Sequence, residues 1–322
     1  MDYEALRMVC SWEFWRMAVL WTISLLYSYI LLFIRRGGGG APVPRRCRRP
    51  MPEPDDDAGR CLRPICVITG ATSGLGKAAA VALAQEGYHV VLGESRTVQE
   101  IRNRQSDAYL EAFQVNLSSF KSIKKFETSL KQWIQDANME HSIQLLVNNA
   151  GMLAKSYRIT EDGFDEMMQA NYIGPFVLTN ILLPLLKNSS TPSRVVNLTS
   201  FTHRCVSEIN LSEKGLSGVR AADPGVVQTG IMRELPPSLS WFAHSVLRLL
   251  NLLQQPDTGV GAVLDAALAP PEASGKYFFG GKGRTIRSSQ LSYDVEVAKK
   301  LWAESLALFN ELQIRECELR TS

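Results

Sequence analysis

The residues best suited to chemistry begin with a glycine-rich turn, Gly70-Ala-Thr-Ser-Gly74-Leu-Gly76. A short β-type run, Ile65–Thr69, precedes this turn, and the strongly helix-forming stretch Lys77–Glu86 follows it. Glycines let the backbone approach a pyrophosphate closely, and a helix N-terminus supplies N–H groups and a favourable dipole. With a second strand at Tyr88–Leu92, these elements predict a dinucleotide-binding βαβ unit.

Four further segments follow in a recognisable order: Leu145-Leu-Val-Asn148-Asn149-Ala150-Gly151, Asn171-Tyr-Ile-Gly174, Arg194-Val-Val-Asn-Leu-Thr-Ser200 and Asp223-Pro-Gly-Val-Val-Gln-Thr229. Together with the T-G-x-x-x-G-x-G spacing of the turn, they resemble the short-chain dehydrogenase/reductase family, and in particular its membrane-anchored, retinol-dehydrogenase-like members. The resemblance covers about Ile65 to Phe279. It implies an α/β fold, a Rossmann-type doubly wound parallel sheet, and hydride transfer between a nicotinamide dinucleotide and a carbonyl or alcohol.

The resemblance also assigns roles to individual residues. It implies a cofactor site at Thr69, Gly70, Thr72, Ser73, Gly74, Leu75, Gly76, Arg96, Asn116, Asn148, Ala150, Gly151, Pro224, Gly225, Val227 and Thr229. Ser200 and Asn171 match two members of the family's catalytic tetrad. Structural alternatives stay open, because the glycines suit tight turns, Asn148 and Asn149 suit buried hydrogen-bonding positions, and Thr229 suits a helix N-cap.

The cofactor preference depends on the end of the second strand, where an acid binds a ribose 2′-hydroxyl and a basic residue binds a 2′-phosphate. The chain reads Val90-Val-Leu-Gly-Glu94-Ser95-Arg96 there. Without a gap Glu94 takes the NAD-type position, whereas a shift of one residue gives Arg96 the NADP-type position. Asn116 stands where the family usually carries an aspartate near the adenine. These residues favour NADP(H) over NAD(H).

The family's acid–base pair, Tyr-x-x-x-Lys, is absent. None of the nine tyrosines is followed by lysine four residues later, and no tyrosine occurs between Tyr172 and Tyr277. On a helix this spacing places both side chains on one face, where the ammonium lowers the tyrosine pKa. We expect the loss to cost a factor of about 10²–10⁴ in proton transfer. His203 and Lys214 are interpreted as surface residues rather than replacements.

The same region is short, since Asp223 lies 23 positions after Ser200. That length is too small for a loop, a helix of typical length and a complete strand. Family members place the catalytic helix and most of the sixth strand here, so we predict an internal deletion near 205–221. Loss of the helix would uncover apolar sheet surface and a strand edge, and would weaken the homodimer that the family commonly forms through it.

The segment Met17–Ile34 contains 18 residues and no charge. At 1.5 Å per residue it nearly crosses a hydrocarbon core, and no small-residue cleavage site follows it, which favours a retained transmembrane anchor. Basic residues collect on the cytosolic side of a membrane, and six follow the segment: Arg35, Arg36, Arg45, Arg46, Arg48 and Arg49. They predict a single-pass protein of the endoplasmic reticulum or another organelle membrane, with its large domain in the cytosol.

Four regions are expected: a tail at 1–16, a transmembrane anchor at 17–34, a basic then acidic Gly/Pro-rich linker at 35–63, and a dinucleotide-binding domain at 64–322. The net charge is only +3, so no nucleic-acid partner is expected. The six cysteines include no C-x-x-C pair and no zinc-like spacing, so no metal is expected either.

Three hypotheses remain. The first is a membrane-anchored oxidoreductase lineage acting on a small lipophilic carbonyl or alcohol, in a form that turns over slowly or not at all. The second is a non-catalytic module that keeps the glycine turn for dinucleotide or lipid binding. The third is a truncated product without a stable fold.

Overall fold

The computed structural model describes residues 12–36, 63–154, 156–200, 203, 220–225, 227, 229, 245, 248 and 253–321. The strands are β1 (Ile65–Ile68), β2 (His89–Leu92), β3 (Leu110–Ala112), β4 (Leu145–Asn148), β5 (Arg194–Leu198), β6 (Arg220–Asp223), β7 (Tyr277–Phe279) and β8 (Thr285–Ile286). The longer helices are α2 (Trp12–Arg36), α3 (Gly74–Gln85), α4 (Ser95–Arg102), α5 (Phe120–Asp136), α7 (Gly174–Lys187), α9 (Pro256–Ala267) and α10 (Val295–Thr321). Short helical segments are α6 (Glu166–Met168), η1 (Gln169–Ile173), η5 (Pro271–Ala273) and η6 (Gln290–Tyr293).

The eight strands form one sheet in the order β3-β2-β1-β4-β5-β6-β7-β8. Every neighbouring pair from β3 to β7 is parallel, and only β7 and β8 run antiparallel. The strand order reverses between β1 and β4, where sheets of this kind bind ligands beyond their carboxyl ends. The predicted Rossmann-type doubly wound parallel sheet is therefore confirmed.

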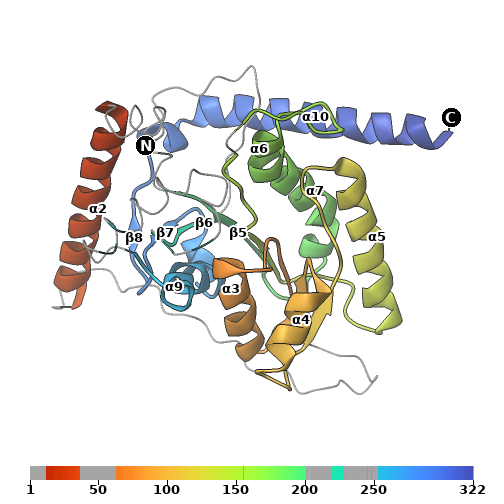
Figure 1. Ribbon diagram of the computed structural model, residues 1–322, viewed down its shortest axis with the longest axis horizontal. Helices are drawn as coiled ribbons and strands as arrows, with labels where there is room; N and C mark the ends of the chain where they lie inside the picture. The colour runs from red at the N-terminus through yellow and green to blue at the C-terminus, as the bar shows by residue number, and fades with distance from the viewer. Residues whose placement is uncertain are drawn as a thin grey trace.

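Two apolar layers cover the sheet (Figure 1). Side chains of α3, α4 and α9 pack on one face, with small residues such as Ala79 and Ala80 bringing α3 close to the strands. On the other face lie α5, α7 and part of α10. The buried residues of α5 recur every three or four positions, which puts them on one side of the helix: Phe120, Ile123, Phe126, Leu130 and Ile134. Each such side chain contributes roughly 1.5–3 kcal/mol on burial.

The sixth strand is present, because β6 pairs in parallel with β5 on one side and with β7 on the other. Four residues of this strand, Arg220–Asp223, are therefore enough to keep the sheet continuous. Most of the predicted deletion near 205–221 lies outside the described residues. The two positions at its end, Arg220 and Ala221, belong to β6.

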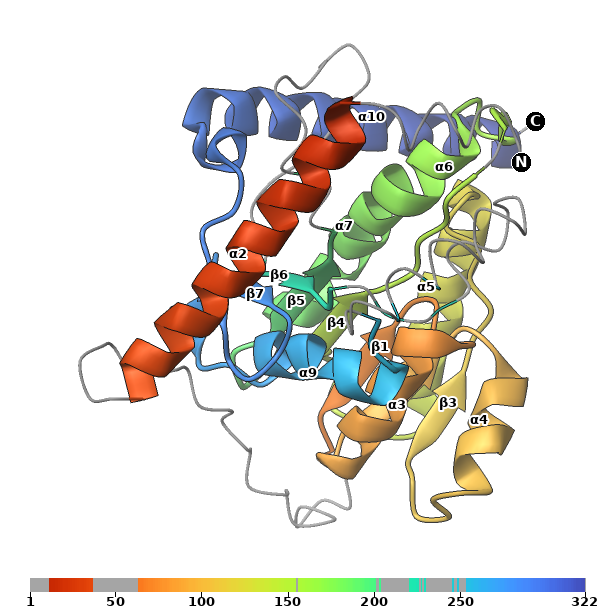
Figure 2. The same ribbon diagram turned by 60° about the vertical axis from the view of Figure 1, so that its left-hand side comes forward.

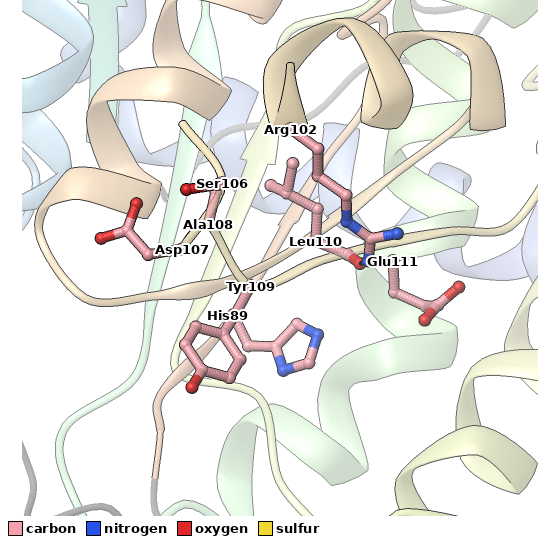
Figure 3. Close-up of a pocket in the computed structure, with 8 residues that line it drawn as sticks. All are labelled: His89, Arg102, Ser106, Asp107, Ala108, Tyr109, Leu110 and Glu111. Atoms are coloured by element: carbon pink, nitrogen blue, oxygen red, sulfur yellow. Dashed lines mark hydrogen bonds between the residues drawn. The ribbon is translucent and has the colours of Figure 1, made fainter. Parts of the chain in front are cut away.

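The edge strand β3 is protected by charged side chains (Figure 3). Arg102 donates from Nη2 to the carbonyl oxygen of Leu110 at 2.6 Å, and the Glu111 carboxylate accepts from the N–H of Ala112 at 3.2 Å. The Leu110 carbonyl and the Ala112 N–H point away from β2. The residues that alternate with them pair with β2, as Tyr109 does when its carbonyl oxygen accepts from the N–H of Val90. An edge treated in this way cannot readily pair with another strand. Arg102, Leu110 and Glu111 also line an open hollow of about 340 Å³ at this edge of the sheet.

The N-terminal helix α2 runs along the side of the domain that carries β8 (Figure 2). Within the part of the chain that the structure describes, no helix combines the length and the apolarity needed for a membrane span. The expected transmembrane anchor is therefore not confirmed.

Candidate nucleotide and substrate site

The predicted site residues gather at one edge of the sheet. The glycine-rich turn follows β1, Glu94 and Arg96 follow β2, and Asn116 follows β3. The N-N-A-G element ends β4, Ser200 follows β5, and the segment from Pro224 follows β6. Because these strands are parallel, their carboxyl ends meet at the same edge, which is where the sequence analysis expects cofactor and substrate.

The glycines of the turn are required by its geometry. Gly70 has a φ of 62°, and a Cβ there would lie 2.6 Å from the Cα of Ala150. At Gly76, a Cβ would lie 2.3 Å from the carbonyl oxygen of Gly70. Both positions therefore exclude any side chain, and the turn stays open and close to the end of β4.

Thr69 and Asn149 join this turn to the end of β4. The Asn149 amide donates from Nδ2 to the carbonyl oxygens of Thr69 at 2.8 Å and Gly70 at 2.9 Å. The Thr69 hydroxyl accepts from the backbone N–H groups of Asn149 at 3.1 Å and Ala150 at 3.0 Å. These contacts give the Asn149 side chain a structural role, which is the hydrogen-bonding alternative considered for both asparagines of the N-N-A-G element.

Asn148 has a different position, because its side chain is buried beneath the strand end. Its Nδ2 donates to Asn197 Oδ1 on β5 at 2.8 Å and to Thr179 Oγ1 on α7 at 3.1 Å. Its Oδ1 is buried and has no hydrogen-bond partner among the described residues. These contacts join β4, β5 and α7, so the described role of the Asn148 side chain is structural, as the alternative interpretation proposed.

The start of α3 suits an anionic group. Ser73 is the N-cap residue, but its side chain makes no capping hydrogen bond, so this hydroxyl leaves the first-turn N–H groups uncapped. Gly74 has a φ of 53°, and a Cβ there would lie 2.9 Å from Cγ2 of Thr229. The structure thus brings Thr229 from beyond β6 against the glycine-rich turn. Thr72 and Ser73 are exposed beside it, whereas Leu75 is a buried core residue.

Asn171 lies in the π-helical turn η1, inside the otherwise α-helical run from α6 to α7. Its side chain pairs with the backbone of Met152, accepting from N–H at 2.7 Å and donating to the carbonyl oxygen at 2.8 Å. Gly174 ends the turn, and a Cβ there would lie 2.3 Å from the carbonyl oxygen of Leu117. π-Helical turns are frequent at functional sites. This one places the Asn171 side chain against Met152, the residue that follows the N-N-A-G segment in the chain.

Ser200 is exposed, and its carbonyl oxygen accepts from both the backbone N–H and Nδ1 of His203, at 3.1 and 2.7 Å. Nε2 of His203 lies 2.9 Å from Ser288 Oγ and accepts from the N–H of Ser289 at 3.3 Å. A carbonyl only accepts and an N–H only donates, so these contacts require a neutral ring with its proton on Nδ1. His203 therefore fixes the chain after β5 to the segment after β8. The interpretation of His203 as a plain surface residue missed this role.

Asp223, at the end of β6, organises the Pro224–Gly225 turn. Its buried carboxylate accepts from the N–H of Gly225 and from the hydroxyl of Tyr277, both at 2.8 Å. Gly225 has a φ of 75°, which glycine adopts without strain. The Tyr277 ring stands 5.2 Å from the ring of His203, so this phenol lies near Ser200 in the fold but is buried and bound to a carboxylate.

The residues expected to contact the adenosine ribose belong to a cluster of charged side chains on α3 and α4. Lys77 and Arg96 both pair with the Glu100 carboxylate, Arg96 from Nε at 3.5 Å. The hydrogen bond from Lys77 lowers the pKa of Glu100. The Arg96 side chain is 83% exposed, and Glu94 is exposed at the N-cap of α4. Asn116 is also exposed, and its Oδ1 accepts from the N–H of Ser118 at 3.0 Å.

Comparisons with known proteins agree with this arrangement. Residues 64–208 match the sequence profile of the family described as short chain dehydrogenase. Among solved structures, 3-oxoacyl-[acyl-carrier protein] reductase from Brucella melitensis, in complex with NAD, superposes with a TM-score of 0.53 at 19% identity, over 69% of this chain and 96% of that one. An angucycline C-6 ketoreductase with bound NADP gives 0.52 at 20% identity, over 68% and 95%. At these identities the likeness shows the fold.

The curated relatives show the family. Human retinol dehydrogenase 13 is 31% identical, over 75% of this chain and 83% of that protein. Human polyprenol dehydrogenase is 28% identical, over 85% of this chain and 93% of that protein. The chain therefore belongs to the short-chain dehydrogenase family.

Proposed function

We propose that this chain binds NADP(H) at the carboxyl edge of its sheet and belongs to an oxidoreductase lineage whose substrates are lipophilic carbonyls or alcohols. The observation that carries the proposal is the cradle formed by Gly70, Gly74 and Gly76. Any side chain there would meet Ala150, Thr229 or the Gly70 carbonyl, and the Ser73 hydroxyl leaves the N–H groups of α3 uncapped. A pyrophosphate fits such a cradle, because N–H groups and a helix dipole attract anions.

The chain's own residues would hold the dinucleotide at three places. The turn and the start of α3 would receive the pyrophosphate, Arg96 the ribose 2′-phosphate, and Ala150, Gly151 and Thr229 the nicotinamide end. When bound, the nicotinamide supplies or accepts the hydride. Asn149 and Thr69 do not need to touch the cofactor, because their hydrogen bonds keep the turn and the end of β4 in register.

The acid–base step is expected to be weak in this form. Tyr277, whose ring lies beside that of His203, donates from its hydroxyl to the buried Asp223 carboxylate, and His203 already has both ring nitrogens in hydrogen bonds. Neither group can donate a proton to a substrate oxygen without breaking these contacts. Ser200 and Asn171 thus remain as parts of an incomplete tetrad, and we propose slow or absent turnover.

Thermal unfolding of the full-length chain in mild detergent, with and without saturating NADPH or NADH, tests the proposal. A cooperative transition that rises by several degrees with NADPH supports a formed site and the NADP preference. A cooperative transition that neither nucleotide moves would reject the dinucleotide site. Ready NADPH oxidation with a lipophilic aldehyde, abolished in Ser200→Ala, would reject the proposed impairment.

Arg96 and Glu100 provide a sharper test of the cofactor preference. Removing the guanidinium in Arg96→Gln should weaken NADPH binding about tenfold and leave NADH binding unchanged, because one charge-assisted contact is worth about 1.5 kcal/mol. Glu100→Gln should strengthen NADPH binding a few-fold, since it removes a negative charge that competes for Arg96. Arg104→Gln, another exposed arginine near α4, serves as the control. Equal effects on both nucleotides would reject Arg96 as the selective residue.

A non-catalytic dinucleotide-binding role is the second candidate, and the complete cradle beside an incomplete tetrad favours it. Nucleotide affinity without any substrate turnover would distinguish it from a slow enzyme.

We also propose that the N-terminal helix attaches the chain to a membrane, with the domain on the cytosolic side. Met17–Ile34 is free of charge and six arginines follow it, and the relatives named for retinol and polyprenol suggest lipophilic substrates. Co-flotation of the full-length chain with vesicles that contain anionic lipid tests this attachment, and a chain that stays in the soluble fraction would reject it.

A further inference from the structure

The N-terminal helix makes a specific contact with the domain. Tyr29, on α2, lies against Arg284, the residue immediately before β8. The guanidinium carbon of Arg284 is 4.3 Å from the centroid of the Tyr29 ring. Arg284 is only 5% exposed and donates to the carbonyl oxygens of Gly280 at 2.6 Å and Gly281 at 3.1 Å. A cation held over an aromatic face is stabilised by about 0.5–2 kcal/mol. This contact joins α2 to the end of the sheet, and Figure 1 shows α2 lying beside β8.

The rest of α2 presents a continuous apolar stripe to the outside. Seven large side chains recur at intervals of three or four residues and are each 53–81% exposed: Trp12, Trp15, Val19, Ile23, Leu26, Ile30 and Phe33. This spacing puts all of them on one side of the helix. Ser24 and Leu31, which fall on the other side, are half-buried. One side of α2 therefore contacts the domain and the other is open.

Charge and aromatic residues indicate what covers this stripe. Two tryptophans stand at one end of the stripe, and the six arginines of positions 35–49 follow the other end. Tryptophan favours the membrane–water boundary, and arginines next to an apolar helix face attract anionic lipid headgroups. A bilayer surface matches both features.

We propose that α2 lies in the plane of a membrane surface, with its apolar stripe in the lipid and the domain packed on its water-facing side. This inference rests on the proposed membrane attachment and replaces the expected transmembrane orientation with an in-plane one.

The contact with Arg284 is the reason for this orientation. Tyr29 lies five residues before Ile34, the last apolar residue of the segment, so in a spanning helix it would lie about 8 Å inside the hydrocarbon. Arg284 would then enter the lipid together with the turn Gly280–Gly283, whose glycines have positive φ. A charged side chain and irregular backbone are both costly in hydrocarbon. With α2 in the plane, Arg284 stays on the water side and the contact survives.

The side of the membrane reached by the N-terminus distinguishes the two orientations. We would synthesise the full-length chain with sealed microsomes, keeping Cys10 as the reporter and replacing Cys47, Cys61, Cys205 and Cys317 by serine; Cys66 is fully buried and can stay. The matched control keeps Cys317, which is exposed on α10, and replaces Cys10. We expect a membrane-impermeant maleimide to label both chains equally before detergent is added. Cys10 protected until detergent is added would overturn the in-plane orientation.

Flotation separates failure of this inference from failure of the membrane attachment. The full-length chain should float with vesicles of phosphatidylcholine and phosphatidylserine, and Leu26→Glu/Ile30→Glu should reduce the floated fraction at least tenfold. Leu26→Met/Ile30→Val, which keeps the stripe apolar, should float like the wild type. No flotation of the wild type would reject the attachment itself. A dimer in detergent-free solution that the glutamate variant disperses, without flotation, would assign the stripe to a second copy and overturn the proposal.

Discussion

After β1, the chain enters a turn in which three glycines prevent clashes and the neighbouring strand end is held by Thr69 and Asn149. After β5, at the same edge of the sheet, it reaches the exposed Ser200, and among the described residues His203 joins this segment to Ser288 and Ser289 through hydrogen bonds. The strands differ in the same way. All four residues of β1 are buried, whereas only one of the five residues of β5 is.

The difference separates binding from chemistry. Interior strands of a parallel sheet are normally covered on both faces, and β1 and β4 meet this expectation while β5 does not. The glycine cradle for the pyrophosphate is built mainly from β1, α3 and the end of β4, all of which are well packed. Catalysis needs groups placed beyond β5 and β6 as well. A chain altered there can therefore keep its cofactor cradle, and variants should be severe in the first region and mild in the second.

The largest effect is expected from Gly76→Val. Its Cβ would lie 2.3 Å from the Gly70 carbonyl oxygen and 2.4 Å from Nδ2 of Asn149, so the turn must move. We expect at least 3 kcal/mol loss in the free energy of unfolding and no stabilisation by nucleotide. Denaturant unfolding with and without NADPH measures both. Gly261→Ala in α9, where the new Cβ meets Gly281 at an ordinary 3.6 Å, should be neutral or slightly stabilising.

Asn149→Ala should have the next largest effect. It removes two hydrogen bonds from Nδ2, one to the carbonyl of the buried Thr69 and one to the carbonyl of the exposed Gly70. The first loss costs about 1–1.5 kcal/mol and the second costs less, so we expect a loss of about 2 kcal/mol in unfolding free energy and weaker nucleotide binding. Asn188→Ala removes a single bond from an exposed amide to His141 and should cost under about 1 kcal/mol. Equal losses in the two variants would contradict a special role for Asn149.

The sequence predicted the fold, and the residues that it assigned to the cofactor meet at one edge of the sheet, because glycines and short β-branched runs have few alternative uses at this spacing. It placed Asn148 and Asn149 alike, either beside the cofactor or in hydrogen-bonding positions, and could not separate their contacts, because two adjacent asparagines point to opposite sides of a strand end. Contacts between distant segments were also missed. Nothing near His203 in the chain indicates Ser288 or Ser289, and Tyr277 lies 54 positions from Asp223. Such pairs depend on the sheet order.

A third prediction concerns how the free energy of unfolding depends on pH, through a histidine on β2 in the nucleotide-binding half. His89 begins β2, with its ring 4.8 Å from that of Trp133. Burial, with help from Arg63 and Arg102, lowers its pKa to about 4. The unfolded chain binds this proton near pH 6.5, so the folded state loses stability as pH falls from 6.5 toward 4. We expect this loss to be about 1–2 kcal/mol, allowing for partial exposure of the ring.

Chemical denaturation of wild type and His89→Phe between pH 4 and 7 isolates this contribution. The phenyl ring keeps the aromatic contact with Trp133, so the variant should be less sensitive to acid than the wild type. His141→Gln, at an exposed position, should follow the wild-type curve. Identical pH profiles for wild type and His89→Phe would mean that other groups carry the acid sensitivity.

The smallest effect is expected from Ser200→Ala, in the second region. The carbonyl oxygen of Ser200 accepts from His203, and alanine keeps that carbonyl. The side chain is exposed, so we expect a change below about 0.5 kcal/mol in unfolding free energy and an unchanged shift of the melting temperature with NADPH. The measurement is the same thermal unfolding, made beside Gly76→Val. A substantial loss of stability or of nucleotide binding would show that the segment after β5 is organised as firmly as the turn after β1. The two regions would then no longer differ in the way that separates binding from chemistry here.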